Sequence, residues 1–111
     1  MTRPSNLVQG TLDLLILKIL DLEPRSGWAI GQRIRQASND ALQVSDGSLY
    51  PALHKLEQQG WIAAEWRVTE NNRRAKVYAL TPPGRRRLEE ERASWERLSG
   101  AITHVVRLTE A

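Results

Sequence analysis

The sequence contains no cysteine, and this absence excludes two kinds of structure. Without thiols, neither a disulfide framework nor a thiolate zinc site can form. The only two histidines, His54 and His104, stand far apart and lack the neighbouring carboxylates typical of a metal site. No serine–histidine–aspartate arrangement, pair of carboxylates in an apolar setting or glycine-rich phosphate loop occurs either. We therefore expect no metal, no cofactor and no catalytic residues, which means that the protein is not predicted to be an enzyme.

Long apolar runs are missing too. The most apolar segment, Leu12–Leu22, is too short to span a bilayer and contains Asp13, Lys18 and Asp21. The chain does not open on a basic segment followed by an apolar one, as a secretion signal would. We therefore expect a cytoplasmic protein without a membrane partner, whose 111 residues form one compact unit.

The basic residues are unevenly distributed, although the net charge is only +3. Residues 1–64 contain six basic and six acidic residues, and residues 88–111 have an excess of acidic ones. Between them, residues 65–87 carry seven basic residues against two acidic ones. Such a concentrated positive segment is typical of a surface that binds phosphates. On charge alone, a solvated charged loop explains the segment equally well.

Two helices are predicted in the first forty residues. The first covers Thr11–Leu22 and is apolar on nearly its whole circumference. Such a helix must be buried on more than one side, which in a small domain favours a partner chain. The second begins at Ser26 or Gly27 and ends near Ser38. Its predicted inner face consists of Trp28, Ile30, Ile34 and Ala37.

The third predicted helix covers Asp46–Gln59, with Ser45 as N-cap and Gly60 as its C-terminal stop. Its buried stripe consists of Leu49, Leu53 and Leu56. A helix that approaches base edges must be small or hydrogen-bonding on the opposite face. That face contains Gly47, Ser48, Pro51, His54 and Lys55, with Tyr50 on its flank. Taken alone, the same pattern also describes an ordinary amphipathic helix with a solvated face.

Residues 61–68 and 75–81 are rich in β-branched and aromatic side chains and predict a β-hairpin. The polar segment between them contains Asn71 and Asn72, which tolerate left-handed turn geometry. Leu42 and Val44, in the link before the third helix, indicate a further, very short strand. Three basic residues lie at or beside the predicted turn, namely Arg73, Arg74 and Lys76.

The last predicted helix begins after Thr81, with Pro82 in its first position, and continues to about Leu108. Its length of about 40 Å far exceeds the radius of gyration of about 13 Å expected for such a domain. The helix must therefore project from the domain. Its apolar residues are spaced like a coiled-coil seam, and a second copy of the chain is the simplest partner for them. The seam consists of Leu88, Trp95, Leu98, Ile102 and Val105.

Three helices, a hairpin and a long helix, in this order, predict a mainly α fold with a small β-hairpin. We expect a winged helix-turn-helix over residues 1–81 and a C-terminal dimerisation helix over residues 82–111. The predicted function is a dimeric, sequence-specific regulator that binds a pseudo-palindromic operator in double-stranded DNA, with half-sites about one helical turn apart. A winged-helix protein–protein adaptor without DNA binding is the alternative. The expected DNA-binding residues are Ser45, Gly47, Ser48, Tyr50, Pro51, His54, Lys55, Arg73, Arg74 and Lys76.

Three motifs in this order resemble the PadR-like transcriptional regulators, and the resemblance covers about residues 7–108. They are Gly10-Thr11-Leu12-x-Leu14-Leu15-Ile16-Leu17, Val44-Ser45-x-Gly47-Ser48-Leu49-Tyr50-Pro51-Ala52-Leu53-x-x-Leu56-Glu57-x-x-Gly60-Trp61-Ile62 and Arg73-Arg74-x-Lys76-x-Tyr78-x-Leu80-Thr81-x-x-Gly84. The chain is most similar to short-type members, which have a single C-terminal dimerisation helix. The resemblance implies a dimeric, usually repressing regulator. It also implies that Tyr50 and the basic hairpin contact DNA, and that the first and last helices build the dimer. The chain departs from many members at Trp28 and Val77, where they have tyrosine.

Two features of the last predicted helix, Trp95 and the cations of its first turn, each have two possible interpretations. Trp95 is either a seam residue or, as the resemblance to drug-sensing short members implies, part of a cavity between subunits that stacks on a small aromatic effector. The cations of the first turn either contact phosphates or pair with the glutamates that follow about four residues later. These two sets are Arg85, Arg86 and Arg87, and Glu89, Glu90 and Glu91.

Overall fold

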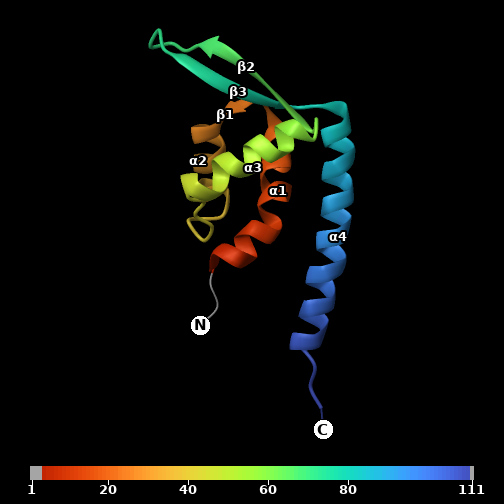
Figure 1. The fold of residues 1–111 in the computed structure, drawn as a ribbon. Helices are drawn as coiled ribbons and strands as arrows, with labels where there is room; N and C mark the ends of the chain where they lie inside the picture. The colour runs from red at the N-terminus through yellow and green to blue at the C-terminus, as the bar shows by residue number, and fades with distance from the viewer. Residues whose placement is uncertain (1–3, 111) are drawn as a thin grey trace.

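The computed structural model describes the backbone of residues 4–110 and the side chains of residues 11–110. Three helices form the body of the molecule, a twisted hairpin lies across one end of them, and a long helix runs down one side (Figure 1). The helices are α1 (Pro4–Leu22), α2 (Gly27–Ala37), α3 (Asp46–Gln58) and α4 (Pro82–Val106). The strands are β1 (Arg25–Ser26), β2 (Ile62–Val68) and β3 (Arg74–Leu80).

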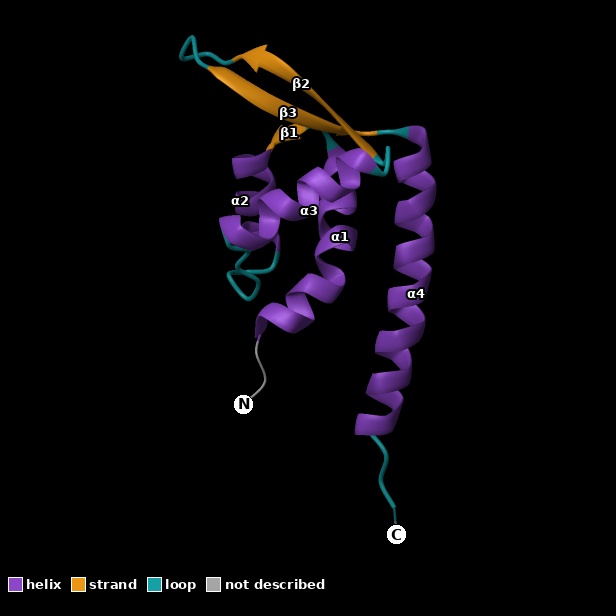
Figure 2. Ribbon diagram, viewed as in Figure 1, coloured by secondary structure: helices purple, strands orange, loops and turns teal. Residues whose placement is uncertain are grey.

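The sheet is antiparallel, with β3 between the short β1 and the edge strand β2 (Figure 2). Arg25 pairs with Tyr78, and Ile62 pairs with Leu80 at the base of the hairpin. The predicted hairpin is therefore confirmed, but the short strand expected around Leu42 and Val44 is wrong. The third strand lies at Arg25–Ser26 instead, because the chain is extended after α1 and reaches β3 before α2 begins.

The core lies where α1, α2 and α3 meet beneath the base of the hairpin. Leucine and isoleucine dominate it, and Ile16, Leu17, Ile30, Leu53 and Leu56 are fully buried. Helix α1 contacts the other three helices and β3. It is therefore buried on several sides, as its apolar circumference predicts. The chain itself provides much of that burial, but Leu14 and Leu15 are only partly buried and Leu22 is 53% exposed, so a partner chain against α1 stays a prediction.

The inner face predicted for α2 is only half right. Ile30 and Ile34 are buried, whereas Ala37 is exposed and the Trp28 side chain is 70% exposed. Trp28 precedes Ile30 by two residues, which on a helix places it on nearly the opposite side. Gly27, not Trp28, is the buried residue at this end of α2.

Helix α4 begins as predicted. The Thr81 side chain accepts a hydrogen bond from the Gly84 N–H at 3.1 Å, and Pro82 follows the cap. Its 25 residues extend well beyond the body, so the molecule is 65 Å long but only 29 Å and 20 Å wide in the other directions (Figure 1). None of the helices in the described part of the chain is long and apolar enough to cross a membrane.

Leu88 corrects the predicted seam of α4. Its side chain is 3% exposed and belongs to the core of its own chain, so it is not available to a second subunit. The reason is that the N-terminal part of α4 still lies against α1. The other seam residues follow beyond the body and are exposed, namely Trp95, Leu98, Ile102 and Val105.

Candidate nucleic-acid interface

Helix α3 presents a continuous outward face opposite its buried leucines. Leu49, Leu53 and Leu56 are at most 2% exposed. On the other side Gly47, Pro51 and His54 are exposed, as is Ser45 in the N-cap position. The Ser45 side chain makes no capping bond to the helix, and its hydroxyl donates to the Ser48 Oγ at 3.3 Å. The outward face is therefore small near its N-terminus, as close approach to another molecule requires, and the exposed Asp46 carboxylate lies beside it in the first turn.

The two flanks of α3 are tied to neighbouring elements by ion pairs. Lys55 Nζ lies 2.6 Å from the Asp13 carboxylate of α1. On the opposite flank, the Glu57 carboxylate lies 3.4 Å from Lys76 Nζ of β3. Two of the cations predicted to contact DNA are thus already paired within the chain. Their positive charge is partly neutralised, and they also fix α3 relative to α1 and the hairpin.

Lys76 keeps its charge at neutral pH. Electrostatic attraction to Tyr78, and next the hydrogen bond to Glu57, raise the pKa of the Lys76 ammonium above its ordinary value. The ammonium also lies 5.4 Å from the centre of the Tyr78 ring. Because this pKa is raised, Lys76 loses its proton only well above neutral pH. Its titration therefore cannot change the charge of this surface near pH 7.

Tyr50 rests on the first turn of α2, against Gly27. A Cβ atom at Gly27 would lie 2.8 Å from Tyr50 Cε1, 3.2 Å from its hydroxyl oxygen and 3.3 Å from Leu53 Cδ1. The phenol ring therefore occupies the space that any side chain at Gly27 would take. Tyr50 remains 44% exposed, so its ring is positioned by α2 while one edge still faces solvent.

Replacing Gly27 with alanine is expected to displace the Tyr50 ring and to weaken DNA binding about tenfold, the effect of losing one good contact. The fold should persist, because the ring can rotate away from the added methyl group. Gly31→Ala is the matched control in the same helix, where a Cβ would meet only Leu49 Cδ2 at 3.5 Å. We would measure duplex affinity by fluorescence anisotropy. Equal affinities of the two variants, or a further loss of affinity when Gly27→Ala is added to Tyr50→Ala, would show that Gly27 does not act through the position of Tyr50.

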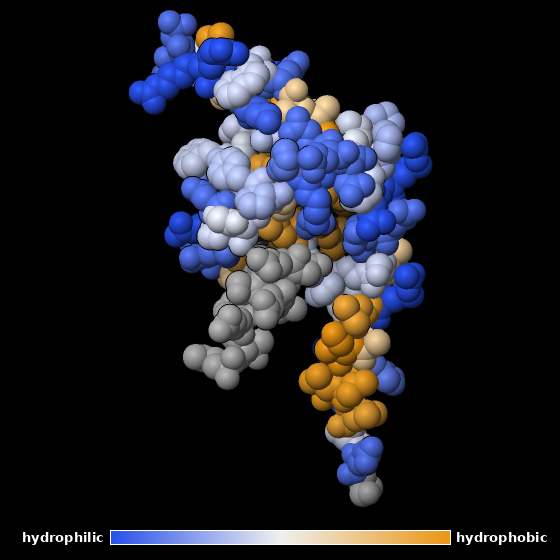
Figure 3. Space-filling view, in the orientation of Figure 1, coloured by the Kyte–Doolittle hydropathy of each residue, from blue (hydrophilic) through white to orange (hydrophobic). Residues whose placement is uncertain are grey.

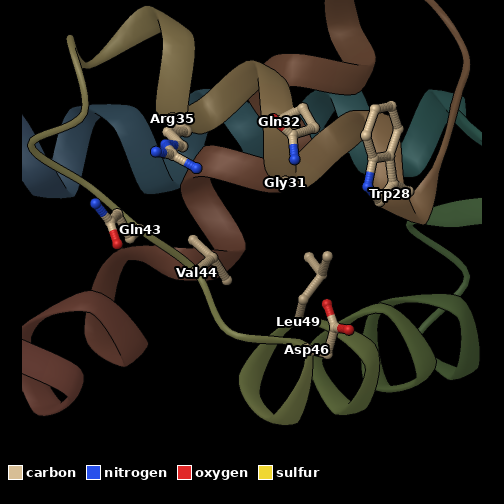
Figure 4. Close-up of a pocket in the computed structure, with 8 residues that line it drawn as sticks. All are labelled: Trp28, Gly31, Gln32, Arg35, Gln43, Val44, Asp46 and Leu49. Atoms are coloured by element: carbon tan, nitrogen blue, oxygen red, sulfur yellow. The ribbon is translucent and has the colours of Figure 1, made fainter.

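A hollow of about 260 Å³ lies between one side of α2, the link at residues 43–44 and the first turn of α3 (Figure 4). Leu49 and Gly31 lie on its walls, and Trp28 stands at one end of it. Arg35, also on α2, is held by Asp40 at 2.9 Å. The exposed Trp28 indole thus lines the same hollow as Asp46 of α3 and does not belong to the core.

The tip of the hairpin is a short, hydrogen-bonded turn. The Thr69 N–H donates to the Arg73 carbonyl at 2.7 Å, and Asn72 adopts the left-handed conformation with φ 59°. The expectation of left-handed geometry at this pair of asparagines is confirmed for Asn72. The turn leaves the side chains of Arg73 and Arg74 exposed at the end of the hairpin.

The three cations at the start of α4 have different surroundings. Arg87 pairs with Glu91 at 2.7 Å and Glu90 at 3.5 Å, and its guanidinium lies 4.6 Å from the centre of the Trp61 ring. Arg85 instead contacts Asp21 of α1 at 2.7 Å. Arg86 is exposed and takes part in no ion pair within the described residues. Pairing with the following glutamates is therefore found for Arg87, and phosphate contact by Arg85 and Arg86 stays a prediction.

The structure adds three residues that sequence reasoning did not assign to this surface. Gly27 positions Tyr50, Glu57 connects α3 to the hairpin, and Trp66 lies exposed on β2. Strand alternation could have found Trp66, because it places Trp66 on the same face as the basic residues of β3. The contacts of Gly27 and Glu57 join separate elements, so no local sequence pattern predicts them.

Three helices followed by an antiparallel hairpin, with α3 exposed beside it, define a winged helix-turn-helix protein. The chain belongs to the PadR-like family of transcriptional regulators, whose family model matches residues 16–90. It is 42% identical to a transcriptional regulator of Mycobacterium tuberculosis over 82 residues, which cover 74% of this chain and 72% of that protein. It is also 39% identical over 89 residues to an uncharacterised transposon protein of Streptomyces fradiae, of which the match covers 24%.

Solved structures show the same architecture over nearly the whole chain. A transcriptional regulator from Clostridium thermocellum aligns with a TM-score of 0.84 at 25% identity, covering 92% of this chain and 99% of that one. A PadR family transcriptional regulator from Eggerthella lenta aligns with a TM-score of 0.78 at 30% identity, covering 95% and 89%. The long helix α4 is included in these alignments, so the predicted fold class is confirmed and the chain is a transcriptional regulator of this family.

Proposed function

We propose that this regulator binds DNA sequence-specifically through α3 and the hairpin, and that it does so as a homodimer. One observation carries the proposal. The Glu57–Lys76 ion pair connects a flank of α3 to β3, so the exposed face of α3 and the basic hairpin lie next to each other. In a winged helix-turn-helix protein the second helix of the motif enters the major groove and the hairpin lies along the neighbouring backbone.

The two parts of this surface have different tasks. Ser48, Tyr50 and His54 offer hydrogen-bonding groups to base edges, while Gly47 and Pro51 let the helix approach closely. Arg73 and Arg74, which have no ion pairs within the described residues, supply positive charge for phosphates. Lys55 and Lys76 contribute less charge, because each already has a carboxylate partner.

The exposed C-terminal half of α4 supports the homodimer. Apolar side chains gather on this half, where no other part of the described chain covers them (Figure 3). Soluble monomers rarely leave such a continuous apolar stripe exposed on a projecting helix. A second copy would cover it and would place two α3 helices for a pseudo-palindromic operator. Trp95, 38% exposed, lies on this stripe and serves as a seam residue. An aromatic effector and a repressing role stay predictions from the family resemblance.

Removing Arg73 tests the hairpin assignment. Arg73→Ala should weaken binding to all duplex sequences and should reduce the slope of log affinity against log salt by about one. Arg97→Ala, which removes an equal charge from an exposed position on α4, should leave both quantities unchanged. His54→Ala should instead cost about 1–3 kcal/mol at one position of the operator only. A wild-type chain that fails to shift duplex DNA at low salt would favour the adaptor function.

A further inference from the structure

The hairpin has an inner face, formed by Trp66 and Val68 of β2 and by Arg74, Lys76 and Tyr78 of β3. Antiparallel pairing places Trp66 opposite Lys76 and Val68 opposite Arg74, and paired residues point to the same side of a sheet. At its base this face packs on the helices, where Tyr78 is 6% exposed. Toward the tip it extends past the helical body, and there Trp66 is 59% exposed (Figure 1).

Packing within the chain does not explain an indole in this position, because most of its surface remains in water. Its defined contact is with Arg74, whose guanidinium carbon lies 5.1 Å from the centre of the Trp66 ring. This distance is within the range of about 6 Å in which a cation is attracted to an aromatic face. Trp66 therefore restricts the orientation of a guanidinium that belongs to the neighbouring strand.

Arg74 differs from the other cation of the inner face. Lys76 is bound by Glu57 at 3.4 Å and lies over Tyr78. The ion pairs and side-chain hydrogen bonds found across residues 11–110 do not include the Arg74 guanidinium, so its N–H donors and its charge face solvent. Arg74 is thus held in position without being neutralised.

We propose that Trp66 is a positioning residue for DNA binding, which holds the Arg74 guanidinium so that its N–H groups bind a backbone phosphate of duplex DNA. This inference rests on the proposed DNA binding of the chain and adds a residue to it. A guanidinium presents its donors as a planar fork that matches two phosphate oxygens. Stacking on the indole restricts the long arginine side chain before DNA arrives, which lowers the conformational entropy lost on binding.

If Trp66 only positions Arg74, its removal should lower the affinity for DNA without changing the salt dependence of binding. A double-mutant cycle tests this. Wild type, Trp66→Ala, Arg74→Ala and the double variant would be titrated with one duplex at several salt concentrations. Arg74→Ala should weaken binding and lower the salt slope by about one. Trp66→Ala should weaken binding about fivefold, on the order of an exposed cation–π contact, while the salt slope stays at its wild-type value. The double variant should bind no more weakly than Arg74→Ala alone.

The aromatic ring, and not merely an apolar side chain, is required. Trp66→Tyr should therefore keep most of the affinity, whereas Trp66→Leu should behave like Trp66→Ala. Thermal unfolding of each variant shows that the fold is intact, which the exposure of Trp66 leads us to expect. Wild-type affinity of Trp66→Ala, or additive losses in the double variant, would overturn the role of Trp66 while leaving DNA binding by the chain in place. Absence of salt-dependent duplex binding by the wild type would instead overturn the proposed function, and this inference with it.

Discussion

Substituting aspartate for Ile102 is expected to convert a dimer into a monomer and to lower operator affinity at least about a hundredfold. The Ile102 side chain is 52% exposed on the apolar stripe of α4, and a carboxylate there would be buried without a partner in the dimer. Linking two binding modules increases the observed affinity by about 10²–10⁴. A monomer loses this gain, although its own α3 and hairpin are unchanged.

The control for this experiment lies two residues further along α4. His104→Asp introduces the same side chain in the same part of the helix, but on the opposite side from the stripe. Sedimentation should give about twice the chain mass of 12.6 kDa for wild type and His104→Asp, and the single chain mass for Ile102→Asp. A dimer that persists in Ile102→Asp would show that α4 does not form the interface.

A Gly84→Ala variant is expected to lose about 3 kcal/mol of the free energy of unfolding, the upper range for forcing atoms into a packed site. Gly84 is buried in the first turn of α4, where a Cβ would overlap the Trp61 carbonyl oxygen. The added atom would also lie 2.8 Å from the Trp61 carbonyl carbon and 2.9 Å from Leu80 Cδ1. The backbone of the hairpin cannot move aside as a side chain can, so α4 must shift.

That shift would break further contacts at the junction of α3, the hairpin and α4. The Thr81 N–H donates to the Trp61 carbonyl at 3.1 Å, and the Thr81 hydroxyl donates to the Gly60 carbonyl at 2.7 Å. Gly100→Ala is the matched control, because a Cβ there meets nothing within 4 Å. It should stabilise the helix slightly, by about 0.5–1 kcal/mol. Denaturant unfolding compares the two variants, and similar stabilities would show that the junction tolerates displacement.

The sequence predicted those parts of the fold that local chemistry determines. The leucine spacing and the terminal residues gave α3 within one residue of its observed end, and Thr81 with Pro82 gave the start of α4. The β-branched segments around Asn72 gave the hairpin and its turn. In each case the determining contacts lie within a few residues of one another along the chain.

Expectations failed where the outcome depends on contacts between distant elements. Leu88 fits a coiled-coil seam by spacing, but whether it faces α1 or a second chain depends on where the body ends. Spacing also could not show that Lys55 and Lys76 have carboxylate partners, because Asp13 and Glu57 lie 42 and 19 residues away. Spacing along one helix or strand carries no information about these neighbours.

The most direct test of DNA recognition by α3 and the hairpin is selection of bound duplexes from a random DNA pool by the full chain. We expect enrichment of a pseudo-palindrome whose half-sites are about one helical turn apart, because two α3 helices related by a two-fold axis read the same sequence in opposite directions. The enriched sequence should lose its advantage when His54→Ala or Tyr50→Ala protein is used. A pool that remains random after repeated selection at low salt, or an enriched site without two-fold symmetry, would contradict dimeric, sequence-specific binding.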